Sequence, residues 1–119
     1  MIKDLIVFQK LEDLTIFLNP ILSKFPKKEQ YALSEDIKKE LYQISKLVIH
    51  INNSKQNRIK YYFKLSEEFD FLFYLIRLSH KLKYISTNNY MTITEKINEI
   101  IKISCGWLKS NTNSNKMIK

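Results

Sequence analysis

Apolar residues recur at alternating spacings of three and four along four separate stretches of the chain, and this periodicity leaves few folds open. Such a spacing places side chains on one face of an α-helix, and helices that meet along such faces cross at a shallow angle. The stretches run from about Ile2 to Lys24, Lys27 to Ile51, Lys55 to Tyr84 and Asn88 to Lys109. Four amphipathic helices with short connections predict an all-α, antiparallel four-helix bundle.

The inward positions of this bundle follow from the same spacing. They are Val7, Leu11, Leu14, Leu18, Ile21 and Phe25, then Leu33, Ile37, Leu41, Ile44, Val48 and Ile51, then Phe69, Leu72, Ile76 and Ser79, and finally Tyr90, Ile93, Ile97, Ile100, Ser104 and Trp107. We expect one domain over residues 1–110 and, because residues 111–119 are polar and aperiodic, a disordered tail.

Glycine and proline are scarce, with one Gly and two Pro among 119 residues. Tight turns and hairpins depend on these residues, so the scarcity favours an all-helical chain. Pro26 suits the first position of the second helix. Pro20 falls inside the first helix, where its missing N–H predicts a kink or, alternatively, a break into two helices.

The third predicted helix is apolar around nearly its whole circumference between Phe69 and Leu78. Phe71, Phe73 and Tyr74 lie off the inward face, as does Leu75. A helix that is apolar on nearly all sides must be covered on nearly all sides, and three neighbours in one small bundle cover only part of it. This pattern predicts a protein that assembles, most simply with copies of itself.

The chain is strongly basic, with 20 Lys and Arg against 12 Asp and Glu and a net charge of +8. An excess of this size can direct a protein toward nucleic acid, an acidic partner or an anionic membrane. All but two of the basic residues are lysines, so a solvated surface in a lysine-biased composition explains the same count. The net charge alone does not separate these interpretations.

The sequence contains no converging set of catalytic or metal-binding residues. Zinc requires several Cys, His or carboxylate ligands, and Cys105, His50 and His80 lack ligand-type spacing. Both histidines fall near predicted helix C-termini, where they suit the helix dipole, and Cys105 suits a core or interface position. A single Gly excludes a glycine-rich phosphate loop. We therefore expect a non-enzyme without cofactor or metal.

The compartment is expected to be the cytoplasm. No run approaches about 18 uninterrupted apolar residues, which argues against a membrane span and a membrane partner. The N-terminus, with Asp4 among its apolar residues, lacks the layout of a signal peptide. The single cysteine excludes an internal disulfide and is typical of a reducing environment.

Two side chains leave alternatives open. Arg77 lies in the densest apolar run, where its planar guanidinium predicts a partly buried ion pair or helix-end hydrogen bonds at a subunit contact, with phosphate binding as the alternative. Trp107 follows Gly106, which permits close approach of another helix, so we expect the indole to pack there; stacking on a nucleobase is the weaker alternative.

Several segments resemble the Avd family, the accessory variability determinants of diversity-generating retroelements. They are Phe25–Leu33, Leu75–Leu82, Ile97–Ile100 and Gly106–Ser110, with Pro20, Ile85, Ser86 and Tyr90 between them. The resemblance covers about residues 1–110. Four-helix proteins encoded in ribosomal-RNA intervening sequences share the Phe-Pro-Lys part more than the C-terminal part, and the C-terminal part favours Avd.

The resemblance implies a four-helix bundle that assembles into a ring-shaped homo-oligomer, a pentamer in the family. Members of this family partner the retroelement's reverse transcriptase and bind nucleic acid, supporting mutagenic cDNA synthesis and delivery of the cDNA to a variable gene. This chain departs from the family by having Gln30 and Phe73 where Arg is frequent, and Ser34 and Cys105 where Gly is frequent.

We accordingly expect a basic oligomer that binds RNA or DNA and a reverse transcriptase. The candidate nucleic-acid contacts are Lys24, Lys27, Lys28, Arg58, Lys60, Lys64, Arg77, Lys81, Lys83 and Lys109. The candidate oligomer contacts are Phe71, Phe73, Tyr74, Leu75, Leu78 and Trp107. The alternative is a purely structural, self-assembling interaction module of the intervening-sequence type, whose lysines only keep it in solution.

Overall fold

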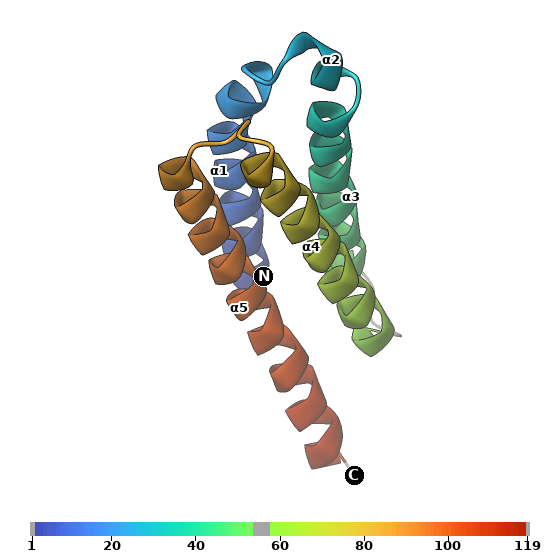
Figure 1. Ribbon diagram of the computed structural model, residues 1–119. Helices are drawn as coiled ribbons and strands as arrows, with labels where there is room; N and C mark the ends of the chain where they lie inside the picture. The colour runs from blue at the N-terminus through green and yellow to red at the C-terminus, as the bar shows by residue number, and fades with distance from the viewer. Residues whose placement is uncertain (1, 54–57, 119) are drawn as a thin grey trace.

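The computed structural model describes the backbone of residues 2–53 and 58–118 and the side chains of residues 6–53 and 59–106. Within these ranges all the regular structure is helical: α1 (Ile2–Ser23), α2 (Lys27–Gln30), α3 (Leu33–Asn53), α4 (Arg58–Lys81) and α5 (Thr87–Ile118). The four long helices confirm the predicted all-α bundle (Figure 1). The predicted helix start at Lys55 lies outside the described residues.

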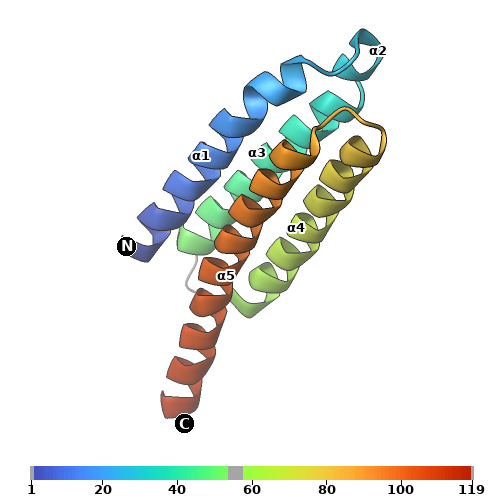
Figure 2. The same ribbon diagram turned by 60° about the vertical axis from the view of Figure 1, so that its left-hand side comes forward.

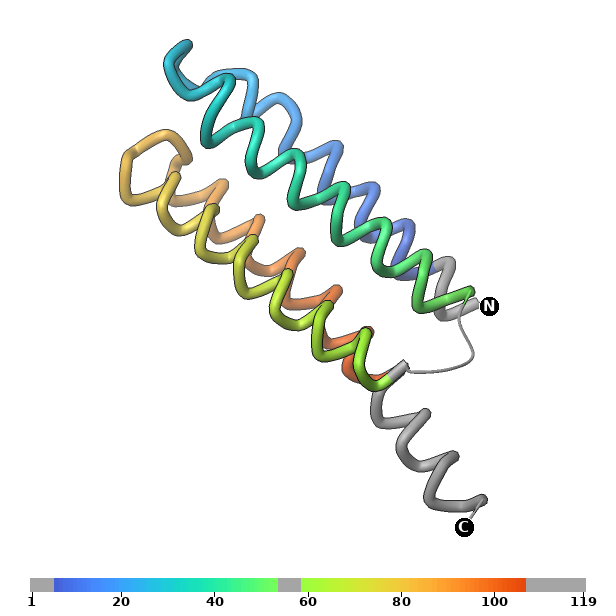
Figure 3. The backbone as a smooth tube through the Cα atoms, turned by 90° about the vertical axis from the view of Figure 1, so that its right-hand side faces the viewer, coloured from blue at the N-terminus to red at the C-terminus, as the bar shows by residue number. Residues whose placement is uncertain are grey.

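The four long helices run alternately up and down, so each packs against antiparallel neighbours (Figure 2). Contacts join α1 to α3, α3 to α4, α4 to α5 and α5 back to α1, which closes a square around one core. Viewed from the side, α1 with α3 and α4 with α5 form two layers (Figure 3).

The core confirms nearly all of the predicted inward positions in the described part of the chain. Phe69, Leu72, Ile76 and Ser79 are all buried in α4, as the spacing predicts. In α1 the prediction is wrong at one position: Leu22 is buried, whereas Ile21 lies half-buried against the core. Tyr90 is also half-buried rather than buried.

The helix boundaries differ from the prediction in the second helix, in the last helix and at the end of the third, where α4 ends at Lys81 and not at Tyr84. The second predicted helix is split, because α2 ends at Gln30 and α3 begins at Leu33, with Pro26 at the N-cap of α2 rather than inside it. The first predicted helix continues through Pro20 as one helix, as expected, and the alternative of a break into two helices is wrong. The last helix continues past the expected end near Lys109 to Ile118; the division of the chain into a bundle and a disordered tail at residue 111 stays a prediction.

The turn between α4 and α5 is built without glycine. The amide of Tyr84 donates to the carbonyl of Ser79 and that of Lys83 to His80, both at 2.9 Å. This pair of hydrogen bonds is the Schellman arrangement, in which the residue after the helix adopts a left-handed conformation. Lys83 takes that place with φ 69°. Ser86 then caps α5, because its Oγ accepts a hydrogen bond from the amide of Asn89 at 3.1 Å.

Candidate nucleic-acid interface and assembly surfaces

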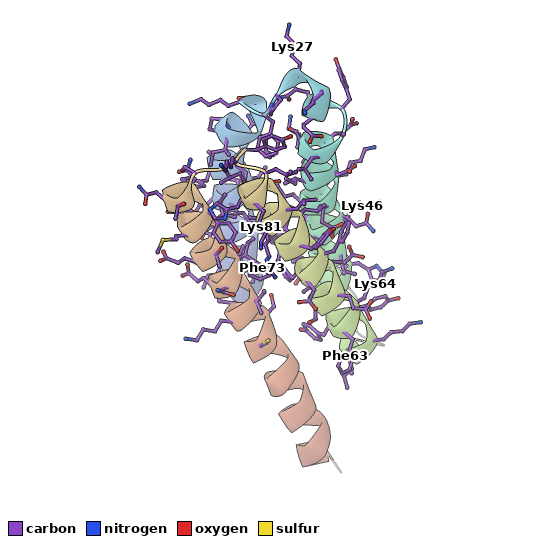
Figure 4. All side chains as sticks on the ribbon, in the orientation of Figure 1. Lys27, Lys46, Phe63, Lys64, Phe73 and Lys81 are labelled. Carbon is purple, nitrogen blue, oxygen red and sulfur yellow. The ribbon has the colours of Figure 1, made fainter. Side chains whose placement is uncertain are left out.

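The predicted nucleic-acid residues do not form one surface. Those at the α1–α2 and α4–α5 turns lie at the same end of the bundle, all exposed: Lys24, Lys27, Lys28, Lys81 and Lys83. Lys60 and Lys64 are exposed near the start of α4, toward the opposite end, and Arg77 is exposed farther along that helix. The side chains of Arg58 and Lys109 lie outside the described ones. Figure 4 shows Lys27 and Lys64 far apart.

Polar side chains fix the geometry of the lysine-bearing end. Gln30 Nε2 donates to the carbonyls of Leu22, Ser23 and Phe25 at 3.1, 3.2 and 2.8 Å, and thereby satisfies the end of α1. The buried Ser34 Oγ donates to the same Leu22 carbonyl at 3.2 Å. Gln30 is therefore a helix-capping residue in this chain.

Tyr84 ties the second turn to the first. Its ring packs against Phe25 with centroids 5.3 Å apart. A hydrogen bond with Glu29 raises the pKa of the Tyr84 hydroxyl above its ordinary value, because it favours the protonated phenol. The two turns therefore form one connected end of the bundle.

A second basic surface is a groove between α3 and α4, here called the α3/α4 groove. It is lined by Lys39, Tyr42, Gln43, Lys46, Leu47, His50, Tyr61, Lys64 and Glu68. Only Lys64 was among the predicted contacts. Lys46 and Lys64 project from the same side of the molecule (Figure 4). The spacing of Lys39, Gln43, Lys46 and His50 along one side of α3 is the signal in the sequence that could have identified this surface.

The lysines of the groove differ in their pairing. Lys39 Nζ lies 3.6 Å from Glu35 Oε1 one turn earlier on α3. Lys46 and Lys64 form no ion pair with any carboxylate of the described residues. Two cations on facing helices without carboxylate partners among the described residues give this part of the groove a positive potential, which attracts anions.

A buried carboxyl lies between the same two helices. Glu40 is 7% exposed, and its Oε2 has no hydrogen-bond partner among the described residues. Burial, followed by a hydrogen bond with Glu68 and the charge of Glu68, raises the pKa of Glu40 to about 8. At neutral pH Glu40 is therefore mainly protonated and uncharged.

The predicted assembly residues separate into three groups. Phe71 and Tyr74 are exposed on α4, with nearly parallel rings whose centroids are 6.3 Å apart. Phe73 and Leu78 lie half-buried against the core. Leu75, at 5% exposure, is buried within its own chain and offers little surface to a partner; its assignment to an oligomer contact stays a prediction. The side chain of Trp107 lies outside the described ones.

Sequence reasoning missed other exposed apolar side chains. Phe63, exposed on α4, borders a groove with Cys105 of α5. On the opposite layer, Ile16 of α1 is exposed and borders a groove that contains Phe8 and continues to Tyr42 of α3. Apolar surface is therefore present on α4 and, separately, on α1. Phe63 and Ile16 occupy outward positions, so an inward period cannot find them.

Both histidines contact neighbouring side chains of the same chain. The His50 ring meets Tyr61 edge-on at 4.4 Å, and the His80 ring stacks on Tyr90 at 4.2 Å. His80 Nε2 also lies 3.3 Å from Thr87 Oγ1, at the start of α5. Among the described residues no three His, Cys, Asp or Glu side chains are arranged to hold a metal ion. Arg77 forms no ion pair with a described carboxylate of its own chain.

A family model described as bAvd-like matches residues 5–111. The chain belongs to the bAvd-like family. The match covers most of the sequence and confirms the resemblance that the motifs indicated. A search of curated proteins returned no match. No helix in the described part of this bAvd-like chain is long and apolar enough to cross a membrane.

Proposed function

We propose that this chain is an accessory protein of a diversity-generating retroelement, a non-catalytic cytoplasmic homo-oligomer that binds nucleic acid and the reverse transcriptase. Membership of the bAvd-like family over residues 5–111 carries the proposal. Two features of the described surface support it: lysines without carboxylate partners, and apolar side chains exposed on separate faces.

The distribution of apolar side chains favours a ring. A closed ring of more than two copies uses head-to-tail contacts, so each copy needs two different faces. Phe71 and Tyr74 on α4 supply one face, and Ile16 beside the groove on α1 supplies the other. A two-fold dimer would need only one of them. The family's pentamer is the assembly that we propose.

The first test of the assembly is the solution mass by light scattering at low and at high salt. A discrete species of about five chains at both salts supports a ring held by apolar contacts, because salt screens charges and does not weaken apolar burial. A monomer at all concentrations contradicts the ring.

The nucleic-acid part of the proposal is tested by the salt dependence of binding. Neutralised phosphates release counterions, so the affinity should fall steeply as salt rises. Lys46→Glu and Lys64→Glu should each lower the affinity for RNA and the salt slope, without changing sequence preference. Lys102→Glu, an exposed change on α5, is the matched control for net charge. Equal effects of all three variants would show that net charge, and not the groove, carries binding.

Binding of the reverse transcriptase is tested separately, by co-expression of the two proteins and co-purification after nuclease treatment. Retention of the polymerase without nucleic acid supports a direct contact. Its loss after nuclease treatment shows that nucleic acid alone joins the two.

The second candidate function is a self-assembling interaction module without a nucleic-acid role. Exposure of Phe63, Phe71 and Tyr74 favours it, because these side chains fit a protein partner. An oligomer that binds neither RNA nor DNA at low salt would establish this candidate over the first.

A further inference from the structure

Aromatic rings and lysines alternate in the α3/α4 groove. Tyr42 on α3 is 63% exposed, and His50, one turn after Lys46 on the same helix, is also exposed. On the facing helix Tyr61 is half-buried and is held by the edge-on contact with His50. A positively charged groove that also offers aromatic rings is the arrangement with which proteins bind single strands.

The strand state follows from what each part of the groove can contact. Lys46 and Lys64 can reach phosphates of either a single strand or a duplex. The face of an aromatic ring, by contrast, can stack only on a base whose own face is free, and duplex bases are stacked on one another. An exposed tyrosine between lysines can therefore stack on any base of a single strand, whereas a blunt duplex offers free base faces only at its two ends.

The acidic end of the groove limits where phosphates can lie. Glu68 lines the groove on α4 and is hydrogen-bonded to the buried Glu40. Lys39 at that end is already paired with Glu35. The phosphates should therefore lie at the other end, between Lys46 and Lys64, which is also where Tyr61 and His50 meet.

We propose that the α3/α4 groove binds single-stranded nucleic acid, with one base stacked on Tyr42 and the adjacent phosphates held by Lys46 and Lys64. This inference rests on the proposed nucleic-acid function and adds to it the strand state and the stacking residue.

The experiment measures fluorescence anisotropy with three labelled probes of about 20 nucleotides, a length that exceeds the site of one small binding domain. The probes are oligothymidylate, an abasic strand with the same phosphates and no bases, and a blunt duplex. The variants are Tyr42→Leu, which removes the ring, and Tyr42→Phe, which keeps it. Tyr31→Leu is the matched control, because Tyr31 is the exposed tyrosine at the other basic surface.

Stacking of one base predicts that Tyr42→Leu binds oligothymidylate at least about fivefold more weakly, whereas Tyr42→Phe and Tyr31→Leu bind as the wild type does. The wild type should bind the abasic strand more weakly by a similar factor, and Tyr42→Leu should not distinguish the two strands. The wild type should also prefer oligothymidylate to the duplex. Because Tyr42 also borders the groove beside α1, light scattering on each variant checks that assembly is unchanged.

Three results would overturn the inference while leaving the proposed function intact. They are equal wild-type affinity for the thymidine and abasic strands, equal affinity for single strand and duplex, or a loss on Tyr31→Leu without one on Tyr42→Leu. The first two comparisons use the wild-type protein, so they hold even if a variant does not fold. Failure to bind any of the three probes at low salt would overturn the proposed nucleic-acid function itself.

Discussion

The buried Glu40, hydrogen-bonded to Glu68, makes the stability of this bundle depend on pH in a direction that can be calculated. The pKa of Glu40 is about 8 in the folded chain, against an ordinary value of 4.5. Between these two values the folded state holds a proton on Glu40 that the unfolded state lacks, so the contribution of Glu40 to stability is fully present below pH 4.5 and is lost as the pH rises to about 8. Each tenfold change in proton affinity corresponds to about 1.4 kcal/mol, which sets an upper bound of about 5 kcal/mol on the loss.

The change Glu40→Gln should remove this dependence, because an amide keeps the shape of the protonated carboxyl and can donate to Glu68. At about pH 5 the variant should exceed the wild type by less than about 1 kcal/mol, and at about pH 9 by several kcal/mol, up to the same bound of about 5. For a domain of this size each kcal/mol shifts Tm by roughly 4 °C. Urea unfolding followed by circular dichroism at about pH 5, 7 and 9 measures the difference directly.

Glu67→Gln is the matched control for this measurement, because Glu67 is exposed on α4 next to Glu68. Its effect on stability should be small and nearly the same at each pH. The reasoning is refuted if the advantage of Glu40→Gln does not grow with pH, or if Glu67→Gln gains as much.

Three further predictions concern single contacts. Gln30→Ala should lower the free energy of unfolding by about 1–2 kcal/mol in urea denaturation, since it leaves α1 carbonyls without a donor, whereas Gln30→Arg should retain most of the stability; equal losses would contradict a capping role. Lys83→Gly should raise Tm by a few degrees, because a left-handed residue other than glycine costs roughly 1 kcal/mol; a lower Tm would show that the lysine side chain matters more than its backbone strain. Leu75→Ala should lower the free energy of unfolding by about 2–5 kcal/mol, because it opens a cavity. Phe71→Ala should leave the stability of the fold nearly unchanged and reduce the mass of the assembly in light scattering. The reverse pattern would contradict the assignment of Leu75 to the core and Phe71 to the assembly surface.

The sequence was sufficient for the fold because the inward period is a property of each helix by itself. Val7 through Leu18, Ile37 through Val48 and Phe69 through Ser79 are buried where the spacing places them. The errors fall where a helix ends or turns. The second predicted helix is split after Gln30, whose side chain caps the end of α1 at Leu22. The apolar period within one helix does not encode such a contact with another helix.

The site was less predictable, because a surface combines residues from different helices. The lysines at the two turns are far apart in sequence and meet only because both turns lie at one end of the bundle. Lys46 and Tyr42 become candidate contacts because Lys64 and Tyr61 line the same groove from the facing helix. Recognising that pairing requires knowledge of which helices are neighbours. Leu75 lies off the predicted inward face and is nevertheless buried, because a helix in a square bundle buries a wider face than a two-helix seam does.

The corner at which α1, α2 and α3 meet also bears on how the chain folds. Its hydrogen bonds from Gln30 and Ser34 to the end of α1 span at most 12 residues. Contacts between residues so close in sequence lose little chain entropy on forming, so they can form before the distant pairing of α1 with α5. The first half of the chain should accordingly acquire amide protection from hydrogen exchange around Leu22 early in refolding, and the closure of α5 against α1 should complete the bundle last.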